Sequence, residues 1–147
     1  MVLSGVPGMY RAARSRLDAV QAARVVAAAA LCLLLAAVRA GGRPRTQNAL
    51  RHFAFSAWLA ARYGEDIAQL VTDEHERHSL ETLDSEADQR NNTAGRRYGR
   101  HHRDELASPS TPVAVWRLLR AGHHQWRAGR LWAVRHGAVE PSAVPPQ

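Results

Sequence analysis

A polar stretch between Asn48 and Gly95 carries side chains that can move protons, bind a metal ion or hold an anion. The candidates for this chemistry are Arg51, His52, His75, Glu76 and Asp88. A histidine beside a carboxylate is a common pair for acid–base catalysis, and arginine binds anionic groups. We therefore expect one of these histidines to act as general base and one carboxylate to orient it. The arginine is expected to hold an anionic group of the substrate.

The same stretch offers ligands for a divalent cation, with Asp84, Asp88 and His75 as candidates. Oxygen ligands suit Ca²⁺ or Mg²⁺, and an added histidine favours Zn²⁺ or Mn²⁺. The run from His75 to His78 is one residue shorter than the His-Glu-x-x-His motif of zinc peptidases, so we reject that site. A metal-free pair of histidine and carboxylate is equally open.

Helical geometry gathers these polar residues on two faces. At 100° per residue, an arc of about 100° on one helix holds Asp84, Asp88, Asn91, Asn92 and Gly95. An earlier helix has a similar face with Asn48, Arg51, His52 and Ser56. We expect the asparagines, the serine and the glycine of these faces to contact substrate or to form a polar network. The alternative is that the faces pack together through buried hydrogen bonds and perform no catalysis.

The elements that must position these residues are predicted to be helices. β-Branched residues are sparse outside the expected helices, so we predict an all-α fold, a small bundle of about five to six helices whose N-terminal helix is apolar. Thr46 is expected to cap the first helix of the polar stretch, and Gly122 to end a later one. Helices are predicted over 47–62, 65–78, from 84 or 85 onward, 113–121 and 123–135.

An apolar run from Val25 to Val38 precedes the polar stretch, and Arg24 and Arg39 flank it. Its fourteen residues are fewer than the about 20 that span a bilayer. A helix over 24–40 is expected, as a membrane anchor, the core of an export signal or a buried helix. We therefore expect a membrane-associated or exported protein, with a cytoplasmic one as the alternative.

Glycine, proline and arginine over 41–45 mark a boundary in the chain. The predicted organisation is a basic N-terminal segment over 1–45, a helical domain over 46–136 with its polar centre at 48–95, and a flexible tail over 137–147. The single cysteine, Cys32, lies in the apolar run and excludes a disulfide within the chain.

Charge is distributed unevenly along the chain. Seven arginines face one acidic residue over 1–45, four face nine over 46–95, and nine face three over 96–147. The simplest interpretation is that the basic flanks neutralise the acidic middle in the folded protein. The alternative is that the flanks bind a phosphate-rich partner, which is a membrane surface or a nucleic acid, while the middle attracts a cation.

The spaced residues resemble the signature of a bacterial domain of unknown function. They are Asn48-x-x-Arg51-His52, His75-Glu76 and Asp88-x-x-Asn91-Asn92-x-x-Gly95-Arg96. That family occurs in small secreted or membrane-linked proteins and in the C-terminal regions of polymorphic-toxin-like proteins. This chain departs from its pattern at residues 53–55 and at 89–90. The resemblance implies a helical fold and a shared polar centre, without a known reaction.

These observations support two hypotheses for function. The first is a toxin-like hydrolase that acts on a phosphoester or a lipid ester, with or without a divalent cation. The second is a non-catalytic helical module for binding or structure, whose polar residues form a buried network.

Overall fold

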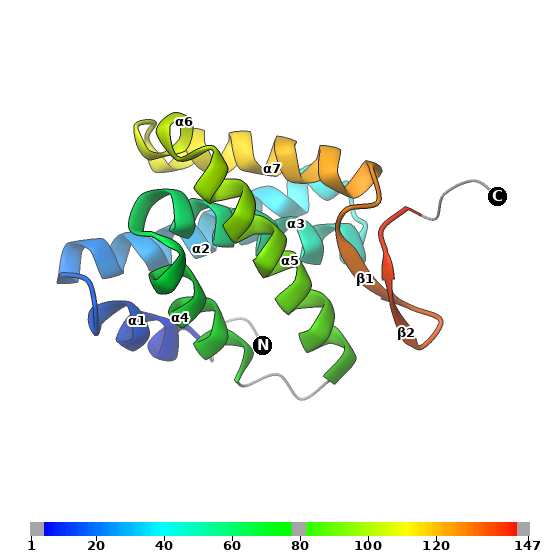
Figure 1. Cartoon of the computed structure of the whole chain (residues 1–147), viewed down its shortest axis with the longest axis horizontal. Coiled ribbons are helices and arrows are strands. Elements are labelled where there is room, and N and C mark those ends of the chain that lie inside the picture. The colour runs from blue at the N-terminus through cyan, green and yellow to red at the C-terminus, as the bar shows by residue number, and fades with distance from the viewer. Residues whose placement is uncertain (1–4, 78–81, 144–147) are drawn as a thin grey trace.

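The computed structural model describes residues 5–77 and 82–143. Within these ranges the chain is all-α apart from one small hairpin, which confirms the predicted fold class (Figure 1). The elements are α1 (Val6–Arg14), α2 (Ala19–Ala40), α3 (Pro44–Tyr63), α4 (Glu65–Glu76), α5 (Thr82–His101), α6 (Arg103–Ala107), α7 (Thr111–Arg127), β1 (Trp132–Arg135) and β2 (Ala138–Pro141).

Helix α3 is the centre of the bundle, because α2, α4, α5, α6 and α7 all pack against it. Every residue over 52–61 is buried. The helix begins at Pro44, so the predicted start at Gln47 was wrong by almost a turn. Proline fits this position since the first turn of a helix needs no backbone N–H from it. Gly64, with a φ of 96°, ends the helix as expected.

The most extensive contact in the molecule is between α3 and α5. Gly95 and Gly99 lie one turn apart on α5 and face the backbone of α3. A Cβ atom at Gly95 would overlap the carbonyl oxygen of Phe53, and one at Gly99 would overlap that of Ala57. The missing side chains therefore allow the two backbones to approach closely, and this brings the polar faces of α3 and α5 together.

Helix α2 confirms the helix predicted over 24–40 and extends it at its N-terminal end. Its start is fixed by a capping box in which Asp18 accepts from the backbone N–H of Gln21 at 2.7 Å. One side of α2 belongs to the core through Val25, Ala28 and Cys32, and the opposite side is exposed. By length and composition α2 could cross a bilayer, a test that core helices and signal sequences also pass.

The C-terminal part of the chain differs from its prediction. Helix α7 continues through Gly122 to Arg127, because the absent Cβ at Gly122 leaves room for the Phe53 ring. The helix predicted over 123–135 is therefore wrong in its second half, where β1 pairs with β2 in antiparallel register. His136 and Gly137 have φ angles of 50° and 76°, as two-residue hairpin turns require. Strand β2 lies inside the predicted tail, whose residues 144–147 are outside the described ranges.

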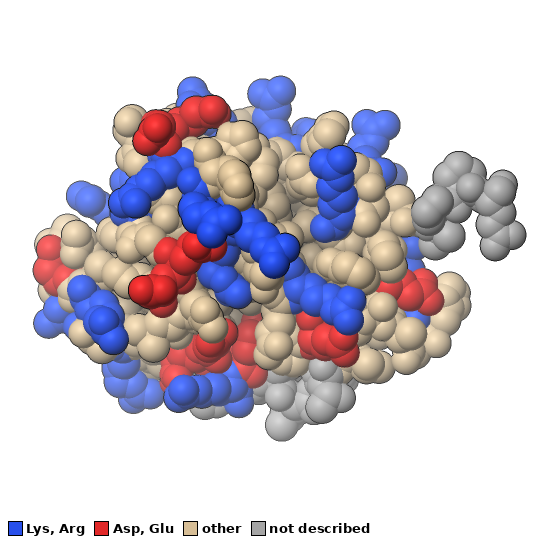
Figure 2. Space-filling view, viewed as in Figure 1, with Lys and Arg blue, Asp and Glu red and all other residues tan. Residues whose placement is uncertain are grey.

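Acidic and basic side chains lie close to one another on the face that carries α5 (Figure 2). Arg100 of α5 binds Glu65 of α4 at 3.1 Å, which joins a basic flank to the acidic middle of the chain. Arg90 and Glu86 form a second pair at 2.6 Å within α5. Part of the charge asymmetry in the sequence is thus neutralised by folding.

Candidate acid–base site

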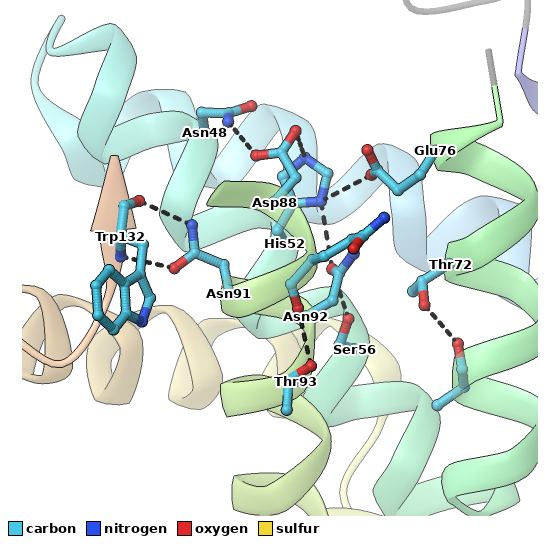
Figure 3. A network of polar contacts seen from close by, with 12 residues as sticks. Asn48, His52, Ser56, Thr72, Glu76, Asp88, Asn91, Asn92, Thr93 and Trp132 are labelled. Carbon is cyan, nitrogen blue, oxygen red and sulfur yellow. Dashed lines mark hydrogen bonds and ion pairs between the residues drawn. The ribbon is translucent and has the colours of Figure 1, made fainter. Parts of the chain in front are cut away.

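Three helices each contribute one residue to a buried cluster of ionisable groups. The members are His52 of α3, Glu76 of α4 and Asp88 of α5, with exposed fractions of 6%, 9% and 7%. Burial of such groups costs free energy unless each finds a partner. The helix contacts described above place them together, although the three are far apart in sequence (Figure 3).

The imidazole of His52 lies between the two carboxylates. Its Nε2 is 3.2 Å from Asp88 Oδ2, and its Nδ1 is 3.6 Å from Glu76 Oε1 and 3.3 Å from Asn92 Oδ1. Because an amide oxygen accepts, the contact with Asn92 is a hydrogen bond when Nδ1 carries the ring proton. A proton on Nε2 would instead face Asp88 and leave Nδ1 free. The Nδ1 atom is then the one that can accept a proton from a reactant.

Hydrogen bonds fix the groups on either side of His52. The amide of Asn48 donates to Asp88 Oδ1 at 2.5 Å. On the other side of the ring, Ser56 donates to Asn92 Oδ1 at 2.8 Å. Ser56 is fully buried and its proton is engaged, so it holds Asn92 in place and is poorly placed as a nucleophile.

Asn91 serves a different part of the molecule. Its amide oxygen accepts from the backbone N–H of Trp132, and its amide nitrogen donates to the carbonyl of Trp132, both at 2.9 Å. The guanidinium of Arg90 lies 4.4 Å from the centre of the Trp132 ring. Asn91 therefore attaches β1 to α5 and points away from His52 (Figure 3).

Burial raises the pKa of Glu76 above that of an ordinary glutamate. The nearby His52 opposes this increase, whereas the negative charge of Asp88 adds to it. Among the described residues, Glu76 Oε1 is buried and makes no hydrogen bond. The carboxyl of Glu76 consequently keeps its proton to a higher pH than usual.

Two hollows meet at Glu76 and Asn92. The first is a cavity of about 280 Å³ with mostly apolar walls, which also reaches Arg51, His52 and His75. The second is a polar pocket of about 370 Å³, whose wall includes Arg96. The imidazole of His75 lies with its centre 6.1 Å from that of His52. The site thus has an apolar side and a polar side, with the ionisable groups between them.

The residues grouped by the fold differ from the predicted metal ligands. One ligand atom each from His52, Glu76 and Asp88 lies within 4.8 Å of the others, and a histidine with two carboxylates suits Zn²⁺ or Mn²⁺. Asp84 is exposed in the first turn of α5, outside this group. Metal binding by Asp84, Asp88 and His75 stays a prediction, and His78 lies outside the described residues.

Sequence reasoning assigned no role to several residues around the site. Thr72 lines the apolar cavity, donates to the carbonyl of Ala68 at 2.9 Å and accepts from Arg96 at 3.4 Å. Burial lowers the pKa of Arg96. Thr72 belongs to no local motif, and Arg96 ends the family signature without a role there, because the contact between the two depends on the packing of α4 on α5. The part of the cavity wall that α1 and α2 supply was also missed, for the same reason.

Comparison with known proteins identifies a family and no closer relative. No curated protein and no solved structure matches the chain. Residues 14–120 match the family described as a domain of unknown function (DUF6973). This range includes the three members of the buried cluster and the helices that hold them. The chain therefore belongs to the DUF6973 family, whose matched region has the buried His52, Glu76 and Asp88 at its centre.

Proposed function

We propose that the protein is an ester hydrolase in which His52 and Glu76 are an acid–base pair. The observation that carries the proposal is a buried imidazole with one carboxylate beside each ring nitrogen, placed at the wall of a cavity. A buried ionisable group with a shifted pKa beside a cleft, such as Glu76, is a common feature of catalytic sites. A toxin-like hydrolase is one setting for this chemistry.

The geometry supports a defined course for the protons. In this scheme His52 carries its ring proton on Nε2, towards the Asp88 carboxylate that Asn48 holds, and Nδ1 is free instead of donating to Asn92. Nδ1 removes a proton from water as the water oxygen bonds to the carbon or phosphorus atom of the ester. The ester C–O or P–O bond then breaks, and protonated Glu76 gives its proton to the departing oxygen. His52 returns its proton to Glu76, 3.6 Å away, which restores the site.

Arg51 is the anion-binding group in this proposal. It lines the cavity beside His52, and its positive charge lowers the pKa of Glu76 slightly, so the two side chains interact electrostatically. A guanidinium at this position stabilises the negative oxygen that develops during attack on an ester. His75 shares the cavity wall and is a second candidate for the proton-transfer role.

The direct test is hydrolysis by the purified full chain of p-nitrophenyl butyrate, p-nitrophenyl decanoate and p-nitrophenyl phosphate. Removing one general base typically lowers the rate by about 10²–10⁴-fold, so we expect a loss of this size in His52→Ala. The matched control is His124→Ala, an exposed histidine on α7. Equal rates for the His52→Ala variant and the wild type would contradict the proposal, as would inactivity of the wild type towards all three esters.

The chelator EDTA distinguishes a metal-free reaction from a metal-dependent one. If the reaction is metal-free, EDTA leaves the rate unchanged. If EDTA abolishes the rate and Zn²⁺ or Mn²⁺ restores it, then His52, Glu76 and Asp88 act as ligands and the metal activates the water. The second result would replace the acid–base assignment with a metal-assisted one.

The alternative function is a non-catalytic module with a buried polar network. The bonds from Asn91 to Trp132 and from Ser56 to Asn92 favour it, because both join separate elements of the fold. Such networks fix the relative positions of helices. Thermal melts of the His52→Ala variant distinguish the cases, since an unchanged melting temperature with lost activity favours catalysis. A large drop in the melting temperature of the His52→Ala variant, with no activity in either the variant or the wild type, favours the structural role.

We also propose that the protein works at a membrane surface. The outer side of α2 exposes Val20, Leu34 and Val38. Exposed arginines lie before, within and after this helix, at Arg14, Arg16, Arg24, Arg43 and Arg45. An apolar helix face with basic residues around it is the pattern of proteins that lie on anionic lipid. The inner side of α2 belongs to the core, so this form of binding leaves the fold intact.

A further inference from the structure

We propose that the apolar cavity binds one unbranched acyl chain of medium length, with its carboxyl or ester group at His52 and Arg51. This inference names the substrate class of the site and rests on the proposed function for its catalytic consequence. It favours acyl esters over the phosphoesters that the same proton chemistry would allow.

The walls of the cavity carry the argument. They come from α1, α2 and α3 and include Val6, Met9, Val26, Ala29, Leu33 and Phe55. Apolar walls of this kind bind a hydrocarbon chain, because burying apolar surface gives about 25 cal/mol per Å². A sugar or a nucleotide would leave its hydroxyl groups without partners along the same walls.

Polar residues lie together among the lining, on α3, α4 and α5. They are Arg51, His52, Thr72, His75, Glu76 and Asn92. Arg51 is half-buried, and among the described residues its buried Nε makes no hydrogen bond. A carboxylate or ester oxygen is the partner that this donor requires. The cavity therefore matches a molecule with a long apolar part and one polar end.

The volume of the cavity limits the length of the chain. A water-sized group occupies about 30 Å³ in a liquid, so a cavity of about 280 Å³ holds on the order of nine such groups. This corresponds to a chain near decanoate in length. Ala30 lines the cavity and is also exposed on the outer side of α2, which places the entrance beside the apolar surface of that helix.

The test is calorimetric titration of the full chain with decanoate, which measures binding without any turnover. We expect saturable binding of one decanoate per chain, and at least about tenfold weaker binding by Ala29→Phe, whose ring would fill the cavity. Ala27→Phe is the matched control, because Ala27 lies on the same helix, is exposed and is not part of the wall. Absence of decanoate binding, or equal affinities in the two variants, would overturn the inference.

Circular dichroism would reveal whether Ala29→Phe misfolds, and a second variant tests the inference independently of it. Leu33→Ala enlarges the cavity, and we expect it to shift the preferred fatty acid from decanoate towards dodecanoate. An unchanged preference counts against the inference. Failure of the two proposals is distinguishable, because decanoate binding without ester hydrolysis keeps the cavity assignment and removes the hydrolase. Hydrolysis of p-nitrophenyl butyrate without decanoate binding keeps the hydrolase and removes the cavity assignment.

Discussion

Glu76 lies where the apolar cavity and the polar pocket meet, and its ionisation couples stability to pH. Its pKa is raised in the folded protein above the ordinary value of 4.5, so the folded state holds this proton more tightly than the unfolded state. The free energy of unfolding therefore falls as the pH rises from about 4.5 through the raised pKa. Above the raised pKa, the buried negative charge at this position destabilises the fold.

Glu76→Gln removes this pH-dependent cost while it retains a similar shape. We expect its melting temperature to equal that of the wild type near pH 4 and to exceed it increasingly as the pH rises towards 8. Thermal melts across this range check the prediction, with Glu86→Gln, an exposed carboxyl on α5, as control. A Glu76→Gln variant that is less stable than the wild type at pH 8 would show that the charge of Glu76 is favourable in the fold.

Replacing Asn92 should show how much the buried polar network contributes to the stability of the fold. Its amide oxygen accepts from Ser56 and contacts His52 Nδ1, and it is only 2% exposed. Asn92→Ala leaves the buried hydroxyl of Ser56 without this acceptor, which typically costs about 1–3 kcal/mol. Chemical denaturation measures the loss, and Gln89→Ala, an exposed change on the same helix, is the control. Equal stability of the two variants would contradict a structural role.

Individual residues of the site were predictable where helical spacing alone brings them together. The faces with Asn48, His52 and Ser56 on one helix and with Asp88 and Asn92 on another follow from a period of 3.6 residues. The partner of each was not predictable, because it depends on how α3 and α5 pack. Asn91 shares the predicted face, yet it bonds to Trp132, since a hairpin that the sequence reading did not anticipate lies beside it.

At the scale of the elements, Gly99 determines how closely α5 approaches α3. In an open helix, alanine would be more stable than glycine by about 0.8–1 kcal/mol. Here we expect Gly99→Ala to destabilise the protein by about 1–3 kcal/mol or more, because its Cβ would overlap the carbonyl oxygen of Ala57. Urea denaturation measures the change against Arg97→Ala, an exposed site on α5. A stabilised Gly99→Ala variant would rule out the close contact.

The order and type of most elements were predictable, and their ends were less so. Gly64 ends α3 because its φ is positive, whereas Gly122 lies inside α7 because the Phe53 ring occupies the space beside it. Local sequence does not distinguish these two uses of glycine. The pair His136 and Gly137 was a usable sign of a hairpin turn, although histidine is less common there than asparagine.

At the scale of the whole molecule, α2 contributes to three parts of the structure. Its inner side completes the core, its residues Val26, Ala29 and Leu33 form part of the cavity wall, and its outer side is exposed. The apolar run was visible in the sequence as a helix. The sequence did not show which side of this helix would face the core, which would line the cavity and which would be exposed, because composition does not show which side of a helix meets other helices.

The outer side of α2 should bind anionic lipid. Leu34 and Val38 are 64% and 70% exposed, and burying each in lipid is worth about 1.5 kcal/mol, which is about tenfold in affinity. We expect the full chain to sediment with phosphatidylglycerol vesicles, less so in high salt because the arginines are then screened. The double variant Leu34→Glu and Val38→Glu should bind at least about a hundredfold more weakly. Leu83→Glu, an exposed change on α5, should bind like the wild type. Equal sedimentation of the double variant and the wild type would exclude α2 as the membrane-binding surface.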